Sequence, residues 1–345
     1  MSTVALDGGL PPPEVVELAR QLVAGRDGQA QLLVRERLKT SVYRLRFEVF
    51  AGSASVVAKR LSPGTARANE LIARRWLPAV GLESACPGLR GVVHERSGSK
   101  IWHIHEDVAG SGLDDSHLDP ARVVPVVELI VDLHTRFAGH ALLPQLRKHG
   151  GELGIGFFAV HVARSIAALE SIGSLGPPLP REQAELRDRL LVRLERLRAG
   201  RDERAALLEK FGGPDTLLHG DLWPSNTLVV RRADGFQATL VDWDRVGLGP
   251  ATYDLSTFLY RLAPDHRPWI LKGYRDAAAR RGWQLPDDSI LNLLFETAEC
   301  ARYACYLGYA AIAASRGEAW GFPMLAEVDT WFARLKPALA ANGGG

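Results

Sequence analysis

The chain has 345 residues, of which 46% are hydrophobic and 24% are charged, as in a folded protein with one large or two medium domains. Its 42 Lys and Arg residues nearly balance 40 Asp and Glu residues, so the net charge of +2 favours neither a nucleic-acid nor an anionic-membrane partner. The three cysteines lack metal-type spacing and are expected to be reduced core thiols. No signal peptide is apparent, and no apolar run approaches the roughly 20 residues of a membrane span. We therefore expect a cytoplasmic protein.

The N-terminal third is expected to form a helix and then a small sheet. Residues 12–25 have the apolar spacing of a short amphipathic helix, which we assign to an N-terminal extension over residues 1–30. Five short segments then have strand-like alternation or β-branched runs: LLVRERL, VYRLRFEVF, ASVVAKRL, GVVHE and KIWHIHED. One helix interrupts them, with Thr65 as its expected N-cap and Gly81 as its stop. The pattern predicts a sheet lobe over residues 31–107.

Residues 108–340 are expected to form a larger, mostly helical lobe. Apolar positions recur about every 3.6 residues in several long segments, among them 121–137, 157–173 and 182–200. Within this lobe, NTLVVRR and FQATLV flank an Ala-Asp-Gly turn at 233–235, a sequence typical of a β-hairpin. The expected fold class is therefore α+β, with a small antiparallel-sheet lobe followed by a larger helical lobe.

Three polar residues, Asp221, Asn226 and Asp242, flank this hairpin. Asp221 lies in HGDLWPSN, Asn226 begins the first strand, and the second strand runs directly into Asp242. Because a hairpin returns the chain to its starting point, we expect these oxygen-bearing side chains to come together. Oxygen ligands suit Mg²⁺, and phosphoryl transfer also requires a carboxylate that orients the attacking hydroxyl. The spacing predicts a phosphoryl-transfer site, and the alternative is a capped turn followed by an ordinary hairpin.

Two other patterns carry less weight. GIGFFA at residues 154–159 matches a dinucleotide-binding pattern, but no strand precedes it, so we do not expect a Rossmann unit. His103 and His105 alternate onto one face of a strand and could hold a metal. With no third ligand nearby, a packed or solvated strand face is the better interpretation.

The pattern H-G-D-x-x-x-x-N, followed by a strand that ends in D-W-D, resembles the aminoglycoside phosphotransferase and choline kinase family, which shares the protein-kinase-like fold. The resemblance implies an enzyme that transfers the γ-phosphate of ATP, or of GTP, to a hydroxyl group of a small molecule. It implies that Asp221 is the catalytic base and that Asn226 and Asp242 hold Mg²⁺. It also implies that His219 shapes the loop and that Asp254 bonds the loop backbone, besides capping the helix that it begins.

The same resemblance assigns the nucleotide to the sheet lobe. Lys59, in SVVAKRL, would grip the phosphates, and Glu70 in the following helix would pair with Lys59 and fix its position. The segment IHEDVAG resembles the family's hinge, where backbone groups from Glu106 to Val108 would meet the adenine. No glycine lies between the first two strands, so the glycine-rich phosphate loop of protein kinases is missing. Groups around Ser41 are the candidates for covering the phosphates in its place.

The acceptor is less well specified by the sequence. Trp223, inside the catalytic motif, and Asp244, beside the metal ligands, are expected to touch it. A polycationic aminoglycoside would need a pocket rich in carboxylates, for which the candidates are Asp114, Asp115, Asp244, Glu296 and Glu299. Three tyrosines spaced by three residues line a pocket or belong to the core: Tyr303, Tyr306 and Tyr309.

Several alternatives stay open at this point. The acceptor is an antibiotic, a sugar, an amino alcohol such as choline or another metabolite, and the chain acts as a monomer or a homodimer. A catalytically silent nucleotide-binding module is less favoured, because all the expected catalytic groups are present. A protein kinase is disfavoured by the missing glycine-rich loop and by the lack of an APE-like segment after Asp242.

Overall fold

The computed structural model describes residues 10–25, 28–113, 118–173 and 178–339. The chain divides into two compact units, which we call the sheet unit and the helical unit. The sheet unit comprises Met1–Asp114, Asp119–Leu129 and Ser225–Arg245, and the helical unit comprises Asp115–Leu118, Ile130–Pro224 and Val246–Gly345. The hairpin that we assigned to the helical lobe therefore belongs to the unit that contains the sheet, and the boundary differs from the expected one at residue 107.

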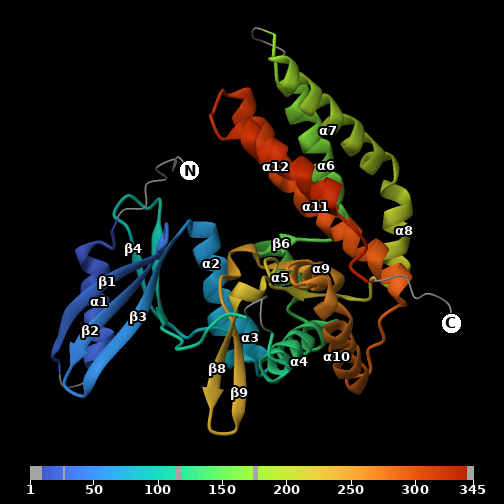
Figure 1. Ribbon diagram of the computed structural model, residues 1–345. Helices are drawn as coiled ribbons and strands as arrows, with labels where there is room; N and C mark the ends of the chain where they lie inside the picture. The colour runs from blue at the N-terminus through green and yellow to red at the C-terminus, as the bar shows by residue number, and fades with distance from the viewer. Residues whose placement is uncertain (1–9, 26–27, 114–117, 174–177, 340–345) are drawn as a thin grey trace. The chain divides into compact units, whose positions relative to one another are not determined.

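The sheet unit is built on a five-stranded antiparallel sheet with strand order β1-β2-β3-β5-β4 (Figure 1). The alternating segments of the sequence form these strands, because alternate side chains must face opposite sides of a sheet. Their bounds are β1 Ala30–Lys39, β2 Val42–Val49, β3 Gly52–Leu61, β4 Leu89–His94 and β5 Ile101–Glu106. The predicted antiparallel sheet is confirmed.

Helix α1, Pro13–Ala24, covers one face of this sheet. In β2 the buried residues alternate along the strand as Tyr43, Leu45 and Phe47, and Val15 of α1 packs into the same cluster. Each such side chain adds roughly 1.5–3 kcal/mol when it is removed from water. Helix α1 is therefore part of the core of the sheet unit rather than a separate extension.

The opposite face of the sheet carries polar groups. Val57 and Lys59 of β3 lie opposite His105 and His103 of β5, respectively. Helix α2, Pro63–Leu71, packs against β5 and continues through a π-helical turn, Ile72–Trp76, and the short helix α3, Leu77–Ala79. Ser62 caps α2, since its side chain accepts a hydrogen bond from the backbone N–H of Thr65 at 3.3 Å. The helix thus begins earlier than our assignment of Thr65 as the cap.

The predicted hairpin is present in the sheet unit as β8, Thr227–Arg232, and β9, Gly235–Leu240. Thr227 lies opposite Leu240, so the residues before β8 and after β9 meet at one end of the hairpin. On its outer edge, Val229 exchanges two backbone hydrogen bonds with Ser111, with N–O distances of 3.0 and 3.4 Å.

The helical unit is organised around the 28-residue helix α11, Asp288–Ser315, which contacts α6, α9 and α12. Gly308 allows α6 to approach closely, because a Cβ atom at this position would lie 2.9 Å from the Ser165 hydroxyl. The other helices are α4 Pro120–Phe137, which spans both units, α5 Leu143–His149, α6 Ile155–Ser171, α7 Arg181–Ala199, α8 Arg201–Phe211, α9 Thr252–Tyr260, α10 Arg267–Arg280 and α12 Gly321–Arg334.

A three-stranded sheet completes the helical unit, with β10 (Gly247–Pro250) between β6 (Gly151–Glu152) and β7 (Asp215–Leu218). The pairing of β7 with β10 joins the chain before the hairpin to the chain after it, because β7 precedes HGDLWPSN and β10 follows Asp242. Across the described ranges of the chain, no helix has the length and apolar character to cross a bilayer.

His103 is fully buried on the sheet, and among the described residues neither of its ring nitrogens has a hydrogen-bond partner. Burial, reinforced by the charges of Arg74 and Lys59, lowers the pKa of His103 from 6.5 to about 4. Between these two values the unfolded chain binds a proton that the folded chain does not. The stability that His103 contributes is therefore complete above pH 6.5 and is lost as the pH falls toward 4.

We expect His103→Leu to flatten the loss of stability in acid. Between pH 6.5 and 4 the free energy of unfolding of the wild type should fall by up to about 3 kcal/mol more than that of the variant, at about 1.4 kcal/mol per pKa unit. Urea unfolding followed by tryptophan fluorescence measures this difference. His94→Leu, at an exposed position on β4, is the control and should keep the wild-type slope. If the free energy of unfolding depended on pH equally in His103→Leu and in the wild type, the lowered pKa of His103 would be contradicted.

Candidate functional site

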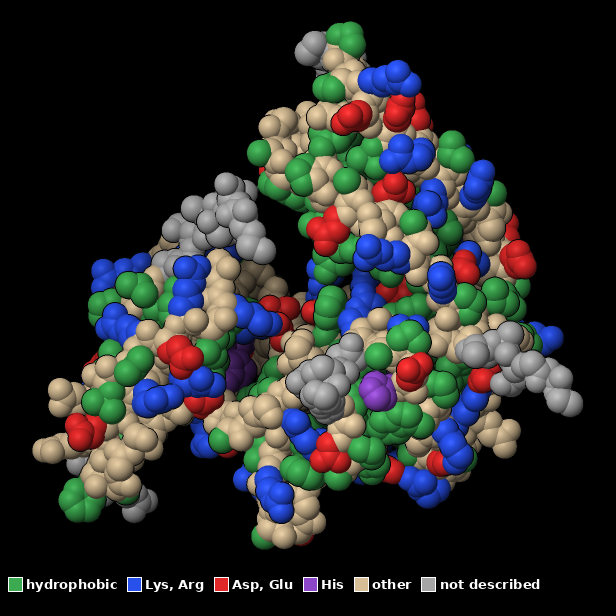
Figure 2. Space-filling view, in the orientation of Figure 1, with side chains coloured by type: hydrophobic (Ala, Val, Ile, Leu, Met, Phe, Trp, Pro, Cys, Tyr) green, Lys and Arg blue, Asp and Glu red, His purple; other side chains and the backbone are tan. Residues whose placement is uncertain are grey.

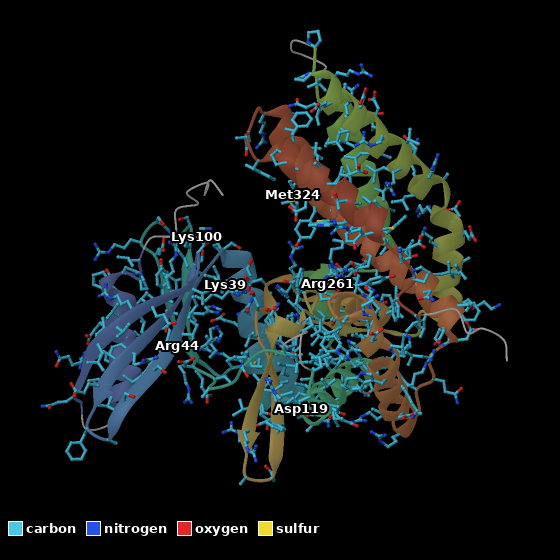
Figure 3. All side chains as sticks on the ribbon, viewed as in Figure 1. Lys39, Arg44, Lys100, Asp119, Arg261 and Met324 are labelled. Carbon is cyan, nitrogen blue, oxygen red and sulfur yellow. The ribbon has the colours of Figure 1, made fainter. Side chains whose placement is uncertain are left out.

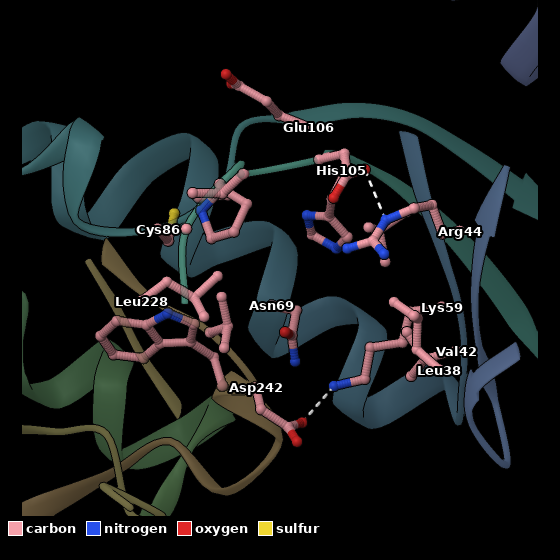
Figure 4. Close-up of a pocket in the computed structure, with 18 of the residues that line it drawn as sticks. Leu38, Val42, Arg44, Lys59, Asn69, Cys86, His105, Glu106, Leu228 and Asp242 are labelled. Atoms are coloured by element: carbon pink, nitrogen blue, oxygen red, sulfur yellow. Dashed lines mark hydrogen bonds and ion pairs between the residues drawn. The ribbon is translucent and has the colours of Figure 1, made fainter. Parts of the chain in front are cut away.

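A cavity of about 260 Å³ lies within the sheet unit, and we call it the sheet cavity. Val42 and Val57 line it from the sheet, and Leu228 lines it from the hairpin (Figure 4). Lys59 and Asp242 point toward each other at its polar end. The cavity therefore combines apolar walls, suited to a flat ring, with a charged end.

The charged end is a compact ion cluster. The Lys59 ammonium lies 2.5 Å from Asp242 Oδ1 and 2.6 Å from Asp244 Oδ1. Lys39, from the end of β1, lies 2.8 Å from Asp242 Oδ2. Burial alone would lower the pKa of Lys59, but the charges of Asp244 and Asp242 raise it above its usual value. For Asp242, burial would raise the pKa, but Lys59 and Lys39 lower it, so both groups are charged at neutral pH.

The hairpin places Asn226 and Asp242 at the same end. The backbone N–H of Val241 donates to the carbonyl of Asn226 at 2.9 Å, which extends the β8–β9 ladder by one step. Asn226 is buried. Asp242 has a φ of 70°, in the left-handed region that few residues other than Gly, Asn and Asp adopt. This backbone turn directs the Asp242 side chain back to Lys59.

The expected pair between Lys59 and Glu70 is not formed in this structure. Glu70 instead lies 3.5 Å from Arg67 and 3.8 Å from Arg74, on its own helix and on the π-helical turn that follows it. The preceding residue, Asn69, faces the sheet cavity, and its amide lies 3.5 Å from Asp244. Neighbouring helix residues point about 100° apart, so a shift of one residue changes which side chain faces Lys59.

The other expected nucleotide-binding residues lie near the sheet cavity in different ways. Glu106 and Val108 line it, but the side chain of Glu106 points away from it, toward Arg90 at 3.4 Å. Ser41 is in the turn between β1 and β2 and is not among the residues that line the cavity, whereas the nearby Lys39 is. Lys39, rather than Ser41, therefore lines the cavity beside this turn.

Arg44, Asp107 and Ser55 form a network that the sequence did not reveal. Asp107 Oδ2 accepts hydrogen bonds from Arg44 Nε at 2.8 Å and from Ser55 Oγ at 2.6 Å. Arg44 lies on the sheet with Lys39 (Figure 3), and it lines the sheet cavity. The network fixes the segment that follows β5 to β2 and β3. The only sequence signal was the Asp within IHEDVAG, which is too common a residue to indicate its partners.

The segment that contains Asp221 belongs to the helical unit, where Asp254 holds its backbone. Asp254 is fully buried and accepts hydrogen bonds from the backbone N–H groups of His219, at 2.7 Å, and Gly220, at 2.9 Å. Burial would raise the pKa of Asp254, but a hydrogen bond from His134 and the neighbouring histidine charges lower it. Asp254 therefore makes the backbone contacts that the resemblance implies for it.

The Asp221 carboxylate is positioned by side chains of the helical unit. Trp223 Nε1 donates to Asp221 Oδ1 at 2.8 Å, and the backbone N–H of Asp221 donates to His219 Nδ1 at 3.3 Å. Trp223 is 37% exposed, and the guanidinium of Arg261 stacks 4.7 Å above its ring. The residues that we expected to form and shape the catalytic loop are thus in mutual contact.

A buried ion cluster, which contacts Trp223 of this loop through Arg261, was not foreseen. Arg302 bonds Glu299 and Thr257, and Arg261 donates to the other oxygen of Glu299 at 2.7 Å. Burial would lower the pKa of Arg302, but the charge of Glu299, with a smaller effect from Asp221, raises it. Arg302 is therefore a buried cation that Glu299 and Thr257 hold in place. The only feature of the sequence that indicated this cluster was the position of Arg302 inside a long apolar helical segment.

The family model described as "Phosphotransferase enzyme family" matches residues 34–287, about three quarters of the chain. No curated protein matches the chain.

Solved structures share the fold at low sequence identity. A choline kinase from Cryptosporidium parvum Iowa II is 12% identical with a TM-score of 0.59, and the match covers 93% of this chain and 94% of that one. A Plasmodium vivax ethanolamine kinase is 14% identical with a TM-score of 0.56, covering 88% and 81%. A macrolide 2′-phosphotransferase from Brachybacterium faecium is 17% identical with a TM-score of 0.52, covering 91% and 96%. At these identities the likeness establishes the fold.

Proposed function

Because the chain belongs to the phosphotransferase enzyme family and is an ATP-dependent small-molecule kinase, we propose specific roles for its charged residues. The observation that carries the assignment is the ion cluster of Lys59, Asp242 and Lys39 at the end of an apolar cavity. A purine ring fits between the apolar walls, and the two lysines then meet the phosphates. Lys39 takes the place of a glycine-rich loop as the cover of the phosphates.

Asn226 and Asp242 fit the coordination of Mg²⁺. Both offer oxygen ligands, and in this structure both carboxylate oxygens of Asp242 are bound by ammonium groups, so the position attracts positive charge. Lys39 is an exposed side chain and can move aside. When bound, Mg²⁺ neutralises charge on the transferred phosphate.

Asp221 orients the acceptor hydroxyl and takes its proton. The hydroxyl oxygen forms a bond to the γ-phosphorus, the bond from the γ-phosphorus to the bridging oxygen breaks, and ADP leaves with that electron pair. Lys59 stays with the phosphates through this step, and Asp254 keeps the Asp221 loop in place. The similar structures are kinases of ethanolamine and choline and phosphotransferases of aminoglycosides and macrolides, so hydroxyl compounds of these classes are candidate acceptors.

Nucleotide binding tests the assignment of Lys59 and Asp242. In calorimetric titrations we expect Lys59→Met to weaken binding of Mg·ATP by about 10–100-fold, the usual value of a charge-assisted hydrogen bond to phosphate. Asp242→Ala should bind ATP equally well with Mg²⁺ and with EDTA, because the metal ligand is gone. It should bind metal-free ATP at least as tightly as the wild type, since a negative charge has been removed.

The exposed Lys148 supplies the matched control, and Lys148→Met should bind Mg·ATP as the wild type does. Wild-type affinity in Lys59→Met, or retained Mg²⁺ dependence in Asp242→Ala, would show that these residues do not hold the nucleotide and its metal.

A further inference from the structure

A pocket of about 550 Å³ lies within the helical unit, and we call it the aromatic pocket. Trp223, from the catalytic loop, lines it together with Tyr303 and Tyr306 of α11 and Trp331 of α12. Small-molecule sites usually measure about 300–1,000 Å³. The aromatic pocket is therefore large enough for a metabolite.

The aromatic pocket borders the residue that we propose as the catalytic base. Trp223 both lines the pocket and donates its indole N–H to Asp221 Oδ1 at 2.8 Å. A compound that rests against Trp223 therefore contacts the side chain that holds Asp221. This contact makes the aromatic pocket a candidate for the acceptor site.

The aromatic side chains brace one another. The ring centroid of Trp331 lies 5.6 Å from that of Tyr303 and 5.6 Å from that of Tyr306, the second pair edge-to-face at 87°. Rings held in this way lose little further freedom when a ligand binds, and their faces favour stacking with another planar group. The pocket therefore suits an acceptor that contains a ring.

The charge of the lining is basic. Four cationic side chains line the pocket against one carboxylate, Glu327: Arg261, Arg267, Arg334 and Lys336. Glu299 neutralises Arg261, but within the described part of the chain no ion pair links a carboxylate to Arg334 or Lys336, which are exposed. Lys and Arg side chains lie near α11 in Figure 2, with Asp and Glu side chains among them, and Figure 3 labels Arg261, which directly follows α9. Such a lining attracts an anion and repels a polycation.

The carboxylates that a polycation would need form ion pairs outside the aromatic pocket. Glu299 is fully buried against Arg302 and Arg261, and Glu296 lies 2.7 Å from Arg204. Asp244 pairs with Lys59 in the sheet unit, and Asp114 and Asp115 lie outside the described residues. None of the described candidates lines the aromatic pocket.

We propose that the acceptor is an anionic hydroxyl compound with a planar ring. The ring stacks between Trp223 and Trp331, and a carboxylate group is bound by Arg334 and Lys336 at the basic edge of the aromatic pocket. The inference rests on the proposed function for its hydroxyl chemistry, although the binding preference is a property of the pocket alone. It sets this chain apart from kinases of aminoglycosides and of choline, whose acceptors are cations.

Three probes that differ mainly in charge test the proposal without ATP. They are 3-phenyllactate, an anion; 3-phenyl-1,2-propanediol, which is neutral; and phenylalaninol, a cation. Quenching of tryptophan fluorescence, confirmed by calorimetry, gives the dissociation constant of each. We expect 3-phenyllactate to bind at least about tenfold more tightly than phenylalaninol, with the neutral diol between them.

The double variant Arg334→Gln/Lys336→Gln should lose this preference for the anion. Its affinity for 3-phenyllactate should fall about tenfold or more, while its affinity for the diol should not change. Arg316→Gln, an exposed arginine on the turn after α11, is the control and should keep it. The proposal is overturned if phenylalaninol binds as well as 3-phenyllactate, or if the double variant binds 3-phenyllactate like the wild type.

A parallel ATP-consumption screen over aromatic hydroxy acids, aminoglycosides and amino alcohols separates the two proposals. Phosphorylation of cationic acceptors, unaffected by the double variant, refutes the anionic acceptor and leaves the kinase assignment intact. Charge-selective binding in the aromatic pocket without phosphorylation of any compound refutes the kinase assignment and leaves the binding preference intact.

Discussion

Asp221→Asn should lower kcat by about 10²–10⁴-fold, the usual contribution of a positioned general base. The amide can still receive the hydrogen bond from Trp223, which is 2.8 Å from the carboxylate oxygen, so the loop should keep its conformation. It cannot accept the proton of the acceptor hydroxyl. Steady-state kinetics with an acceptor found by the ATP-consumption screen measures the effect, and the affinity for Mg·ATP should change by less than about threefold.

The exposed Asp202 provides a control of the same chemistry, and Asp202→Asn should keep wild-type kcat. Full kcat in Asp221→Asn would mean that another group orients the hydroxyl. A loss of nucleotide affinity equal to the loss of kcat would mean that Asp221 acts in binding rather than in the transfer step.

Glu299→Leu should destabilise the protein by about 3–5 kcal/mol, since it removes the carboxylate from a buried ion cluster. Glu299 is fully buried and bonds both Arg302 and Arg261, so the substitution leaves two guanidinium groups without their counter-ion. Burial would raise the pKa of Glu299, but the charges of Arg302 and Arg261 lower it, so the carboxylate is ionised at neutral pH. Urea unfolding at pH 7 measures the loss.

Glu296 lies three residues earlier on the same helix and is the matched control. It pairs with Arg204 but is 42% exposed, so Glu296→Leu should change the free energy of unfolding by less than about 1 kcal/mol. Equal stability of the two variants would contradict the role of Glu299 as the counter-ion of the cluster. A fall in kcat of Glu299→Leu, measured at urea concentrations at which the variant is still folded, would connect the cluster to Asp221 through Arg261, which stacks on Trp223.

The periodicity of the sequence was sufficient to predict the sheet, the hairpin and the helical majority of the chain. Alternation identified the strands because each has one face in a core, as in Tyr43, Leu45 and Phe47. It could not show that the hairpin belongs with the sheet unit, since that depends on contacts such as Ser111 with Val229, more than a hundred residues apart.

The candidate site was predicted where short-range spacing specifies it and missed where it depends on distant segments. Asp221, Asn226 and Asp242 could be predicted because they all lie in one loop and the hairpin that follows it. The contact of Lys39 with Asp242 joins residues 203 positions apart, and no local pattern indicates it. Whether Asn69 or Glu70 faces the sheet cavity depends on which side of α2 packs toward the sheet, and adjacent residues of a helix point about 100° apart. The charge of the aromatic pocket depends on two segments of the helical unit that are about 60 residues apart in the sequence, one with Arg261 and Arg267 and the other with Glu327, Arg334 and Lys336.

The central claim, transfer of a phosphate to a small-molecule hydroxyl, is tested most directly by ³¹P NMR of the wild-type protein with Mg·ATP and a pool of aromatic hydroxy acids, aminoglycosides and amino alcohols. We predict that the γ-phosphate signal is replaced by a phosphomonoester signal together with ADP, and that Asp221→Asn slows this change by about 10²–10⁴-fold. An ATP spectrum that stays unchanged with every hydroxyl compound, or that yields only inorganic phosphate, would contradict it.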